Sequence, residues 1–257
     1  MRPVPALLAL GLVALAPTAH AAEWVTTVGA RVRVKPAYEG AETYVIRPHP
    51  TLSIRRAGRP YRFTPADSSG GVGLIDTDRV VAGPLLWFRY RRTDTGAFSG
   101  LSPVGLAVEP GGFVDLWPAR WLRTRLEVRH GIRGHHGWVG DAGFDLVHSG
   151  RRWSASIGPR IGFGDTHYMA TYFGVTPAEA LASPLIDRAY SPGAGLRYTG
   201  ATMAGAFRIT PRWRTTVDLT YNRLASKALS SPVVQTLGAG HQASIGLGMS
   251  YTFGHVS

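Results

Sequence analysis

Arginines recur at every second position in several segments of the chain, and this spacing is its most chemically suggestive feature. Between residues 121 and 131, Arg123, Arg125 and Arg129 alternate with apolar side chains. Successive side chains of a strand point to opposite faces, so arginines spaced in this way share one face. A guanidinium is always charged and binds carboxylate or phosphate through paired hydrogen bonds. The arginines predicted to face the interior or its rims are Arg31, Arg33, Arg89, Arg91, Arg123, Arg125, Arg129, Arg160 and Arg214.

Two interpretations of this arginine face remain open. Rings of charge set the selectivity of pores, so the arginines could favour anions in a channel or ligand pocket. Buried charges are usually paired, so they could instead neutralise carboxylates within a filled interior. We favour the second interpretation. The carboxylates available for such pairing are Glu109, Asp115, Glu127, Asp141, Asp145 and Asp218.

No metal or cofactor site is predicted. His130, His135 and His136 lie close together, but their spacing matches no strong metal-binding pattern. The chain has no cysteine, which excludes disulfides and thiol chemistry. Aspartates occur mainly among turn residues, where Asp is common.

The chain is not predicted to be an enzyme. Ser149 and Ser154 lie near His148 in the sequence, with His167 farther on, and a lipid-modifying hydrolase would need a serine beside such a base. No Gly-x-Ser-x-Gly motif accompanies them.

The segment 242–253 indicates what kind of element positions the arginines. Its odd-numbered residues are apolar and its even-numbered residues are small or polar. This alternation is typical of a barrel strand with one face toward lipid and the other toward a polar lumen. We expect it to pair with the first strand, so that Ile245 and Leu247 face lipid beside Val32 and Val34.

The N-terminal segment predicts export. Arg2, an apolar run over residues 6–16 and Ala19-His20-Ala21 form a signal peptide over residues 1–21, which leaves residues 22–257 as one barrel domain. No later segment has the about 20 apolar residues of a spanning helix, so a membrane-spanning form would have to be a closed barrel.

The net charge of +12 suits binding to lipopolysaccharide phosphates. Nucleic acid is excluded as a partner, because no basic helix or nucleic-acid motif occurs.

The pattern predicts an all-β fold, a transmembrane antiparallel up-and-down β-barrel of about twelve strands. Short and long connections alternate between them, as periplasmic turns and outer loops do. Tryptophans near strand ends suit interfacial girdles. Pro159 predicts a local irregularity, and a β-bulge is expected near Thr199 and Gly200. The strands are expected at 24–35, 44–55, 59–64, 69–76, 80–92, 106–117, 121–131, 138–148, 152–163, 192–210, 213–222 and 242–253.

One long loop carries a helix signal. Thr176 suits an N-cap, Pro177 the first helical position, and Glu179 the third residue of a capping box. A short helix over residues 177–181 is therefore predicted, ending before Pro184.

The same loop resembles the MipA/OmpV family. The fairly specific part is Tyr172-Phe173-Gly174-Val175-Thr176-Pro177, within residues 168–177. Four weaker matches extend the resemblance over nearly all of residues 22–257. They are 36–40 followed by Pro48, 134–137, 189–196 and 231–234. The chain departs from the commonest barrel ending, because Phe253 is followed by four more residues.

The resemblance implies an outer-membrane protein of Gram-negative bacteria, surrounded by outer-membrane lipid and lipopolysaccharide. It also implies a scaffold that holds a lytic transglycosylase near a penicillin-binding protein during murein remodelling. An anion-favouring passive channel or small-solute permeability protein is the alternative that the arginine face suggests.

Overall fold

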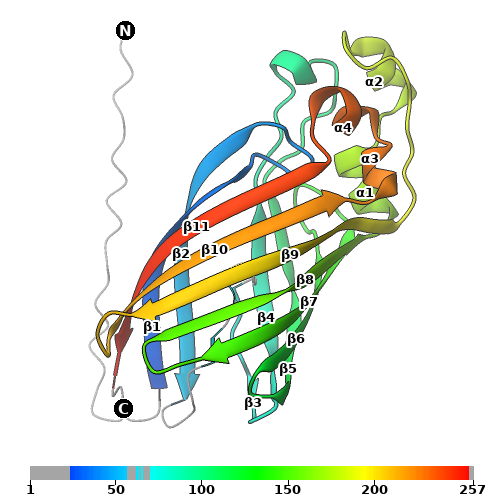
Figure 1. Cartoon of the computed structure of the whole chain (residues 1–257). Helices are drawn as coiled ribbons and strands as arrows, with labels where there is room; N and C mark the ends of the chain where they lie inside the picture. The colour runs from blue at the N-terminus through cyan, green and yellow to red at the C-terminus, as the bar shows by residue number, and fades with distance from the viewer. Residues whose placement is uncertain (1–23, 57–61, 64, 66–69, 255–257) are drawn as a thin grey trace, which may run out of the picture.

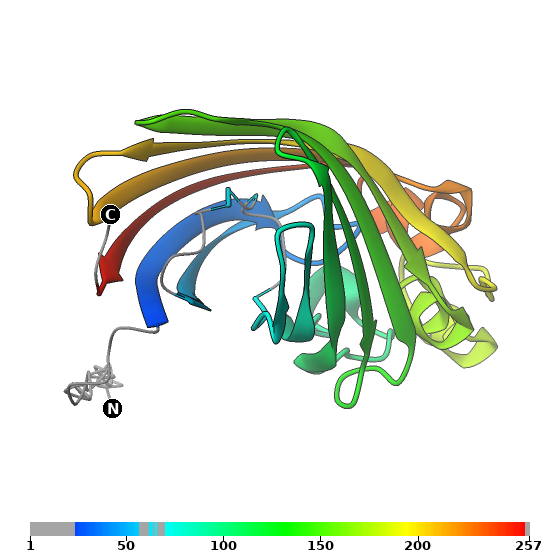
Figure 2. The ribbon, with the colours of Figure 1, turned by 90° about the horizontal axis from the view of Figure 1, so that it is seen from below.

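The protein is a single antiparallel sheet that curls round on itself, with short helices gathered at one end (Figures 1 and 2). The computed structural model describes residues 24–56, 62–63, 65 and 70–254. The predicted signal peptide, residues 1–21, lies outside the described residues. The all-β prediction is confirmed.

Eleven strands and five short helices make up the described part of the chain. The strands are β1 (Trp24–Pro36), β2 (Tyr44–Arg56), β3 (Ile75–Asp76), β4 (Val80–Arg89), β5 (Ala107–Ala119), β6 (Leu122–His130), β7 (Trp138–Ser149), β8 (Trp153–Gly164), β9 (Gly195–Arg208), β10 (Trp213–Leu224) and β11 (His241–Phe253). The helices are η1 (Gly96–Phe98), α1 (Thr166–Phe173), α2 (Pro177–Ala182), α3 (Ser226–Leu229) and α4 (Pro232–Leu237). Among the described residues, none of these helices has both the length and the hydropathy needed to cross a membrane.

The last strand pairs with the first. Val32 lies opposite Leu247 and Val34 opposite Ile245 in the antiparallel ladder. All four side chains are exposed on the outside of the sheet. The predicted pairing and its register are thereby confirmed. The result follows from period-two alternation, because a slip of one residue would turn the apolar side chains inward.

The outer face is apolar along most strands. Exposed leucine, isoleucine, valine, phenylalanine and methionine side chains cover it from β1 to β11. Trp121, Trp153 and Trp213 are also exposed, each at the start of a strand or in the turn before it. Trp117, expected in such a girdle, is instead buried, because its side chain lies on the inner face with Val147 and Ala204.

Short and long connections alternate as predicted. Residues 77–79, 120–121, 150–152 and 209–212 form the short turns, at the end where β1 begins and β11 finishes (Figure 1). The longer connections and the helices lie at the opposite end. In outer-membrane barrels the short turns face the periplasm and the long loops face outward.

The two edges of the sheet, β2 and β3, depart from the sequence prediction. Within the expected strand 59–64 the structure describes Arg62 and Phe63, and neither of them is in a strand. The expected strand 69–76 is reduced to β3 and an isolated bridge from Gly71 to Leu85. Phe63 instead packs inside the sheet against the cluster that contains Trp117.

Two irregularities were predicted, and one was placed wrongly. β9 is one long strand, but its register shifts where Leu196 and Tyr198 face Phe163 and Gly162. The extra residue is Arg197, about two positions before the expected bulge, and Arg197 and Tyr198 both turn away from the outer face. Pro159 interrupts its pairing with β7 without shifting the register, since it has no N–H to donate.

The predicted helix is confirmed as α2, including its capping box. Thr176 Oγ1 accepts a hydrogen bond from the Glu179 N–H, and Glu179 accepts one from the Thr176 N–H. The sequence prediction missed α1, α3 and α4.

Candidate functional site: a buried charge network beneath a loop cap

The inward face of β6 carries the densest part of the arginine pattern. Arg123, Arg125, Glu127 and Arg129 occupy alternate positions there. Neighbouring strands place carboxylates directly opposite: Asp115 faces Arg125, and Asp145 faces Arg123. Opposite charges at facing positions of a sheet stabilise it.

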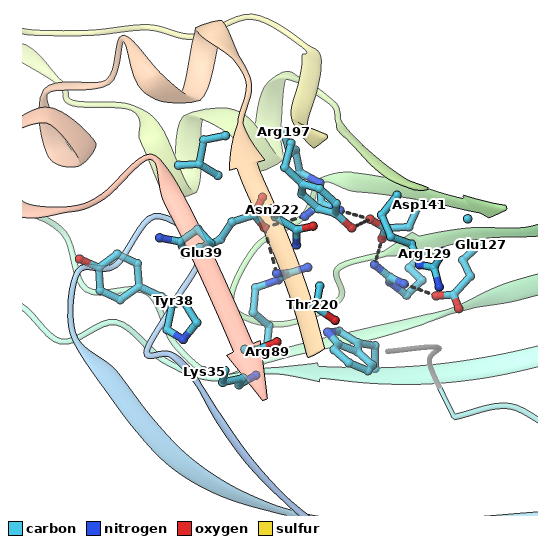
Figure 3. Close-up of a pocket in the computed structure, with 18 of the residues that line it drawn as sticks. Lys35, Tyr38, Glu39, Arg89, Glu127, Arg129, Asp141, Arg197, Thr220 and Asn222 are labelled. Carbon is cyan, nitrogen blue, oxygen red and sulfur yellow. Dashed lines mark hydrogen bonds and ion pairs between the residues drawn. The ribbon is translucent and has the colours of Figure 1, made fainter. Parts of the chain in front are cut away.

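These pairs belong to a continuous chain of ion pairs, which we call the charge network. Six arginines and six carboxylates alternate through it, in the order Arg160, Asp145, Arg123, Asp115, Arg125, Glu127, Arg129, Asp141, Arg197, Glu39, Arg89 and Glu109. Glu109 also contacts Arg129, at 3.2 Å, which closes part of the chain into a ring. Figure 3 shows the section from Glu39 to Glu127.

The charge network is deeply buried, and its formal charges balance. The side chains of Glu109 and Asp145 are 0% exposed and that of Arg123 is 1% exposed. Removing one partner of such a pair leaves an uncompensated buried charge, at a cost of about 3–5 kcal/mol. The ion pairs of these arginines therefore hold strands β4 to β9 together. The ion pairs predicted by the filled-interior interpretation are confirmed for all six carboxylates named for it.

Two members of the charge network were not predicted. Glu39 lies in the connection between β1 and β2, where no strand alternation marks its direction. Its Oε2 accepts hydrogen bonds from Arg197 at 2.6 Å and Tyr168 at 2.7 Å, and lies 3.3 Å from Arg89. Arg197 is the bulged residue of β9, so the alternation that reveals the other arginines fails there. The sequence feature that could have identified Glu39 is its place beside Gly40 in the segment 36–40, which resembles the family.

The remaining predicted arginines lie in three different surroundings. Arg31 and Arg33 share Asp218, at 3.7 Å and 2.8 Å. Arg91 follows β4 and is exposed, whereas its neighbour Arg92 is buried and donates to the Tyr172 carbonyl. Arg214 is half-buried at the short-turn end, where it lines a separate hollow with Arg151, Arg152 and Arg208.

The long connections fold together over the helical end of the sheet as a compact cap, formed by α1 to α4 and residues 90–106. Tyr168, Met169, Tyr172 and Phe173 of α1 form its core with side chains from the connections on either side. Burial raises the pKa of Tyr172 to about 12. A second cluster joins Leu101, Val175, Ile186 and Val233.

The family-like motif residues lie in this cap. Tyr172 and Phe173 end α1, Gly174 caps it, and Val175 pairs with Tyr190. Thr176 and Pro177 begin α2.

Two further family-like segments make buried hydrogen bonds at the helical end of the sheet. Ser231 is fully buried, and its Oγ donates to the Phe173 carbonyl at 2.6 Å while accepting from the Val233 N–H. Gly40 has a φ of +96°, a conformation that favours glycine, and its N–H donates to Gln242 on β11 at 3.1 Å. The motifs that carry the resemblance are therefore the residues that fasten the cap.

The histidines do not form a metal site. His135 is buried, and its Nδ1 accepts a hydrogen bond from the Gly137 N–H, so Nε2 carries the proton and donates to Glu109 at 2.9 Å. His136 is exposed, and His130 packs against Trp138. In the part of the chain that the structure describes, no three His, Asp or Glu residues are placed to hold a metal ion.

The two histidines considered for hydrolysis lie at opposite ends of the sheet. His148 stacks on Trp153 with ring centroids 4.2 Å apart, near the short turns. His167 lies in α1 at the other end of the sheet, with its side chain 80% exposed. Among the described residues, neither histidine is hydrogen-bonded to Ser149 or Ser154.

A cavity of about 240 Å³ lies inside the sheet beside the charge network. Arg125 lines it, as do Arg129 and Asp141 (Figure 3). Thr220, Asn222, Gln242 and Ser244 supply uncharged polar groups from β10 and β11, and Lys35 and Tyr90 also contribute. Such a cavity offers many hydrogen-bond donors and acceptors to a small polar solute.

Several solved bacterial outer-membrane proteins are similar to this chain. The NanC porin has 10% sequence identity and a TM-score of 0.39, with 89% of this chain and 98% of that chain covered. The COG4313 outer membrane channel from Pseudomonas putida F1 has 12% identity and a TM-score of 0.40, with 91% and 96% covered. OmpT of Vibrio cholerae has 8% identity and a TM-score of 0.36, with 89% and 97% covered. No curated protein matches the chain.

The family comparison covers nearly the whole described chain. The model of the family described as MltA-interacting protein MipA matches residues 28–253, from the first strand to the end of the last. The match includes the charge network and every segment that fastens the cap. The chain belongs to the MipA family and is an outer-membrane β-barrel protein.

Proposed function

We propose that this protein is a scaffold that holds murein-remodelling enzymes at the periplasmic side of the outer membrane. The observation that carries the proposal is the family match over residues 28–253, because the family is named for binding MltA. A lytic transglycosylase is the first proposed partner, and a penicillin-binding protein is the second. The pairing of the interior arginines with carboxylates supports the proposal over an anion channel, because these charges are already neutralised within the barrel.

The short-turn end is the proposed binding surface. Murein enzymes work in the periplasm, which this end faces in an outer-membrane barrel. Exposed arginines occur in each of its short turns: Arg79, Arg120, Arg151, Arg152 and Arg212. Complementary charge steers association and fixes orientation, so a partner with an acidic surface fits this end.

The test is capture of the transglycosylase from native membranes after crosslinking. Wild-type protein should capture it, and Arg120→Glu/Arg151→Glu should capture at least about tenfold less, because both charges reverse at the surface. Arg188→Glu is the control, since Arg188 is exposed at the opposite end of the barrel. Repeated failure of the wild type to capture the enzyme would refute the scaffold proposal.

A passive channel is the second candidate, and the polar cavity favours it. If the interior conducts, planar bilayers should show steady anion-preferring currents that change when Arg123 and Arg125 become Gln. The scaffold proposal expects no steady current from correctly folded protein. Lipid-modifying activity is not proposed; unchanged lipid A on overexpression would agree with that.

A further inference from the structure

The inner face of β1 and β2 differs from the rest of the interior in its balance of charge. Arg31, Arg33 and Lys35 alternate along β1, and the ladder places His49 opposite Arg31 and Arg47 opposite Arg33. Residues directly opposite in an antiparallel pair have Cβ atoms about 4.5–5.5 Å apart. Two guanidinium side chains therefore start from facing positions on the same side of the sheet. We call Arg33, Lys35, Arg47 and His49 the cationic face.

Carboxylates do not balance this face as they balance the charge network. Arg31 and Arg33 share the single carboxylate of Asp218. Within the described ranges, no carboxylate lies within 4.0 Å of Lys35 or Arg47. Like charges at facing positions destabilise a sheet. A bound anion would offset the repulsion between these side chains.

The polar atoms of the cationic face point to the same requirement. Arg47 Nε and His49 Nε2 are buried and have no hydrogen-bond partner among the described residues. A buried donor without a partner costs about 1–3 kcal/mol. An oxygen of a bound anion would accept a hydrogen bond from Arg47 Nε, and from His49 Nε2 when that nitrogen carries the ring proton.

Tyr90 completes one side of this region. Its ring centroid lies 4.3 Å from the Arg47 guanidinium carbon and 5.2 Å from Lys35 Nζ. An aromatic face attracts cations, so Tyr90 holds both side chains in place without neutralising them. This contact also links β2 to the residue that follows β4, across the two edges of the sheet.

Lys35 is the residue of the cationic face that borders the interior cavity, and Arg47 lies against Tyr90, which also borders it. Lys35 and Tyr90 line the cavity of about 240 Å³, and Figure 3 shows Lys35 beside it. One water molecule takes about 30 Å³ of liquid volume, so there is room for a small hydrated anion.

We propose that the cationic face binds a small oxyanion of the phosphate class, with Lys35 and Arg47 as its principal ligands. Lys35 supplies a compact charge, and Arg47 supplies planar paired donors suited to phosphate oxygens. Arg33 adds charge from the facing position while remaining paired with Asp218. The site does not depend on the scaffold role.

Calorimetric titration of the full, detergent-solubilised protein with inorganic phosphate tests the proposal. The wild type should bind phosphate saturably at low ionic strength, and sodium chloride at equal ionic strength should give no such isotherm. Lys35→Gln/Arg47→Gln should bind at least about tenfold more weakly, because each charged hydrogen bond lost weakens binding by about that factor. Lys35→Arg should retain binding.

Arg133→Gln/Arg188→Gln is the matched control, since it removes two exposed positive charges that lie outside the cationic face and the short-turn end. It should bind phosphate like the wild type. A wild type without saturable binding would overturn the proposal, whatever the variants do. So would a folded Lys35→Gln/Arg47→Gln protein that binds as tightly as the wild type, or a control that loses binding equally. Capture of the transglycosylase should be the same for the wild type and the Lys35→Gln/Arg47→Gln protein, which separates this result from the scaffold test.

Discussion

At the scale of single residues, Glu39 joins the β1–β2 connection to the charge network and to the cap. It contacts Arg89, Arg197 and Tyr168, which come from β4, β9 and α1. We expect Glu39→Gln to lower the free energy of unfolding by about 3–5 kcal/mol, because two buried guanidinium groups lose a charged partner.

Chemical unfolding in detergent measures this change. Glu42→Gln is the control, since Glu42 is exposed three residues away. Equal stability of the Glu39 and Glu42 variants would show that the charge network does not hold the cap.

Glu179 makes the start of α2 sensitive to acid. Although burial raises its pKa, hydrogen bonds from Ser102 and Thr176 outweigh burial and lower the pKa to about 2. A depressed folded-state pKa stabilises the structure fully above the unfolded value near 4.5, and the stabilisation is lost as the pH falls toward 2. The protection factors for hydrogen exchange at the Ser102 and Thr176 amides, which donate to the Glu179 carboxylate, should therefore be steady at pH 5 and fall between pH 4 and about 2. Constant protection factors in that range would contradict the assignment.

How far single residues could be predicted depended on whether they obey strand alternation. Arg123, Arg125 and Arg129 follow it, and all three belong to the charge network. Arg197 sits in a bulge and Glu39 in a turn, so periodicity does not reveal either of them.

At the scale of elements, the cap depends on one buried hydroxyl between two helices. Ser231 begins α4 and donates to the last residue of α1, Phe173. We expect Ser231→Ala to destabilise the cap by about 1–2 kcal/mol, because a helix cap and a buried hydrogen bond are lost together.

Hydrogen exchange in α1 and α4 measures this effect. Ser226→Ala is the control, since Ser226 is exposed at the start of α3 and makes no capping hydrogen bond. If both variants exchange alike, the Ser231 link does not hold the helices together.

A glycine on β11 lets two interior charges meet. A Cβ at Gly246 would lie 2.3 Å from Asp218 Oδ1 and 3.0 Å from Arg33 Cγ. Gly246→Ala should therefore displace Asp218 and lower stability, whereas Gly205→Ala on β9 should change it little, because its Cβ would meet nothing closer than 3.4 Å. Comparison of the two unfolding midpoints decides this, and equal midpoints would contradict it.

Strands were easier to predict than the helices of the cap. Apolar and polar residues alternate along the whole length of β11, and this alternation determines its register with β1. The α1 segment has a capping Asp165, but its buried Tyr and Phe side chains are stabilised by contacts with distant loops that no local pattern reports. In the strand expected at 59–64, the structure describes Arg62 and Phe63 outside any strand, and Phe63 packs against interior residues far away in sequence.

At the scale of the whole molecule, an apolar outside and a charged inside imply a barrel wall in lipid. Leu247 is 62% exposed and lies between Val32 and Val217 on neighbouring strands. A charge on the lipid face near mid-membrane costs about 2–4 kcal/mol, so Leu247→Arg should reduce folding into bilayers. Leu181→Arg in α2 is the control, since Leu181 is 90% exposed outside the strands. Equal folding yields in vesicles would be inconsistent with a lipid-facing Leu247.

We propose that the short-turn end holds a murein enzyme while the interior charges stabilise the barrel. Photo-crosslinking in living cells tests this proposal, with a photoreactive residue placed at Arg120 in one strain and at Arg188 in another. We expect a crosslink to the lytic transglycosylase from position 120 and none from position 188. A crosslink from position 188 alone, or none from any short-turn position, would contradict it.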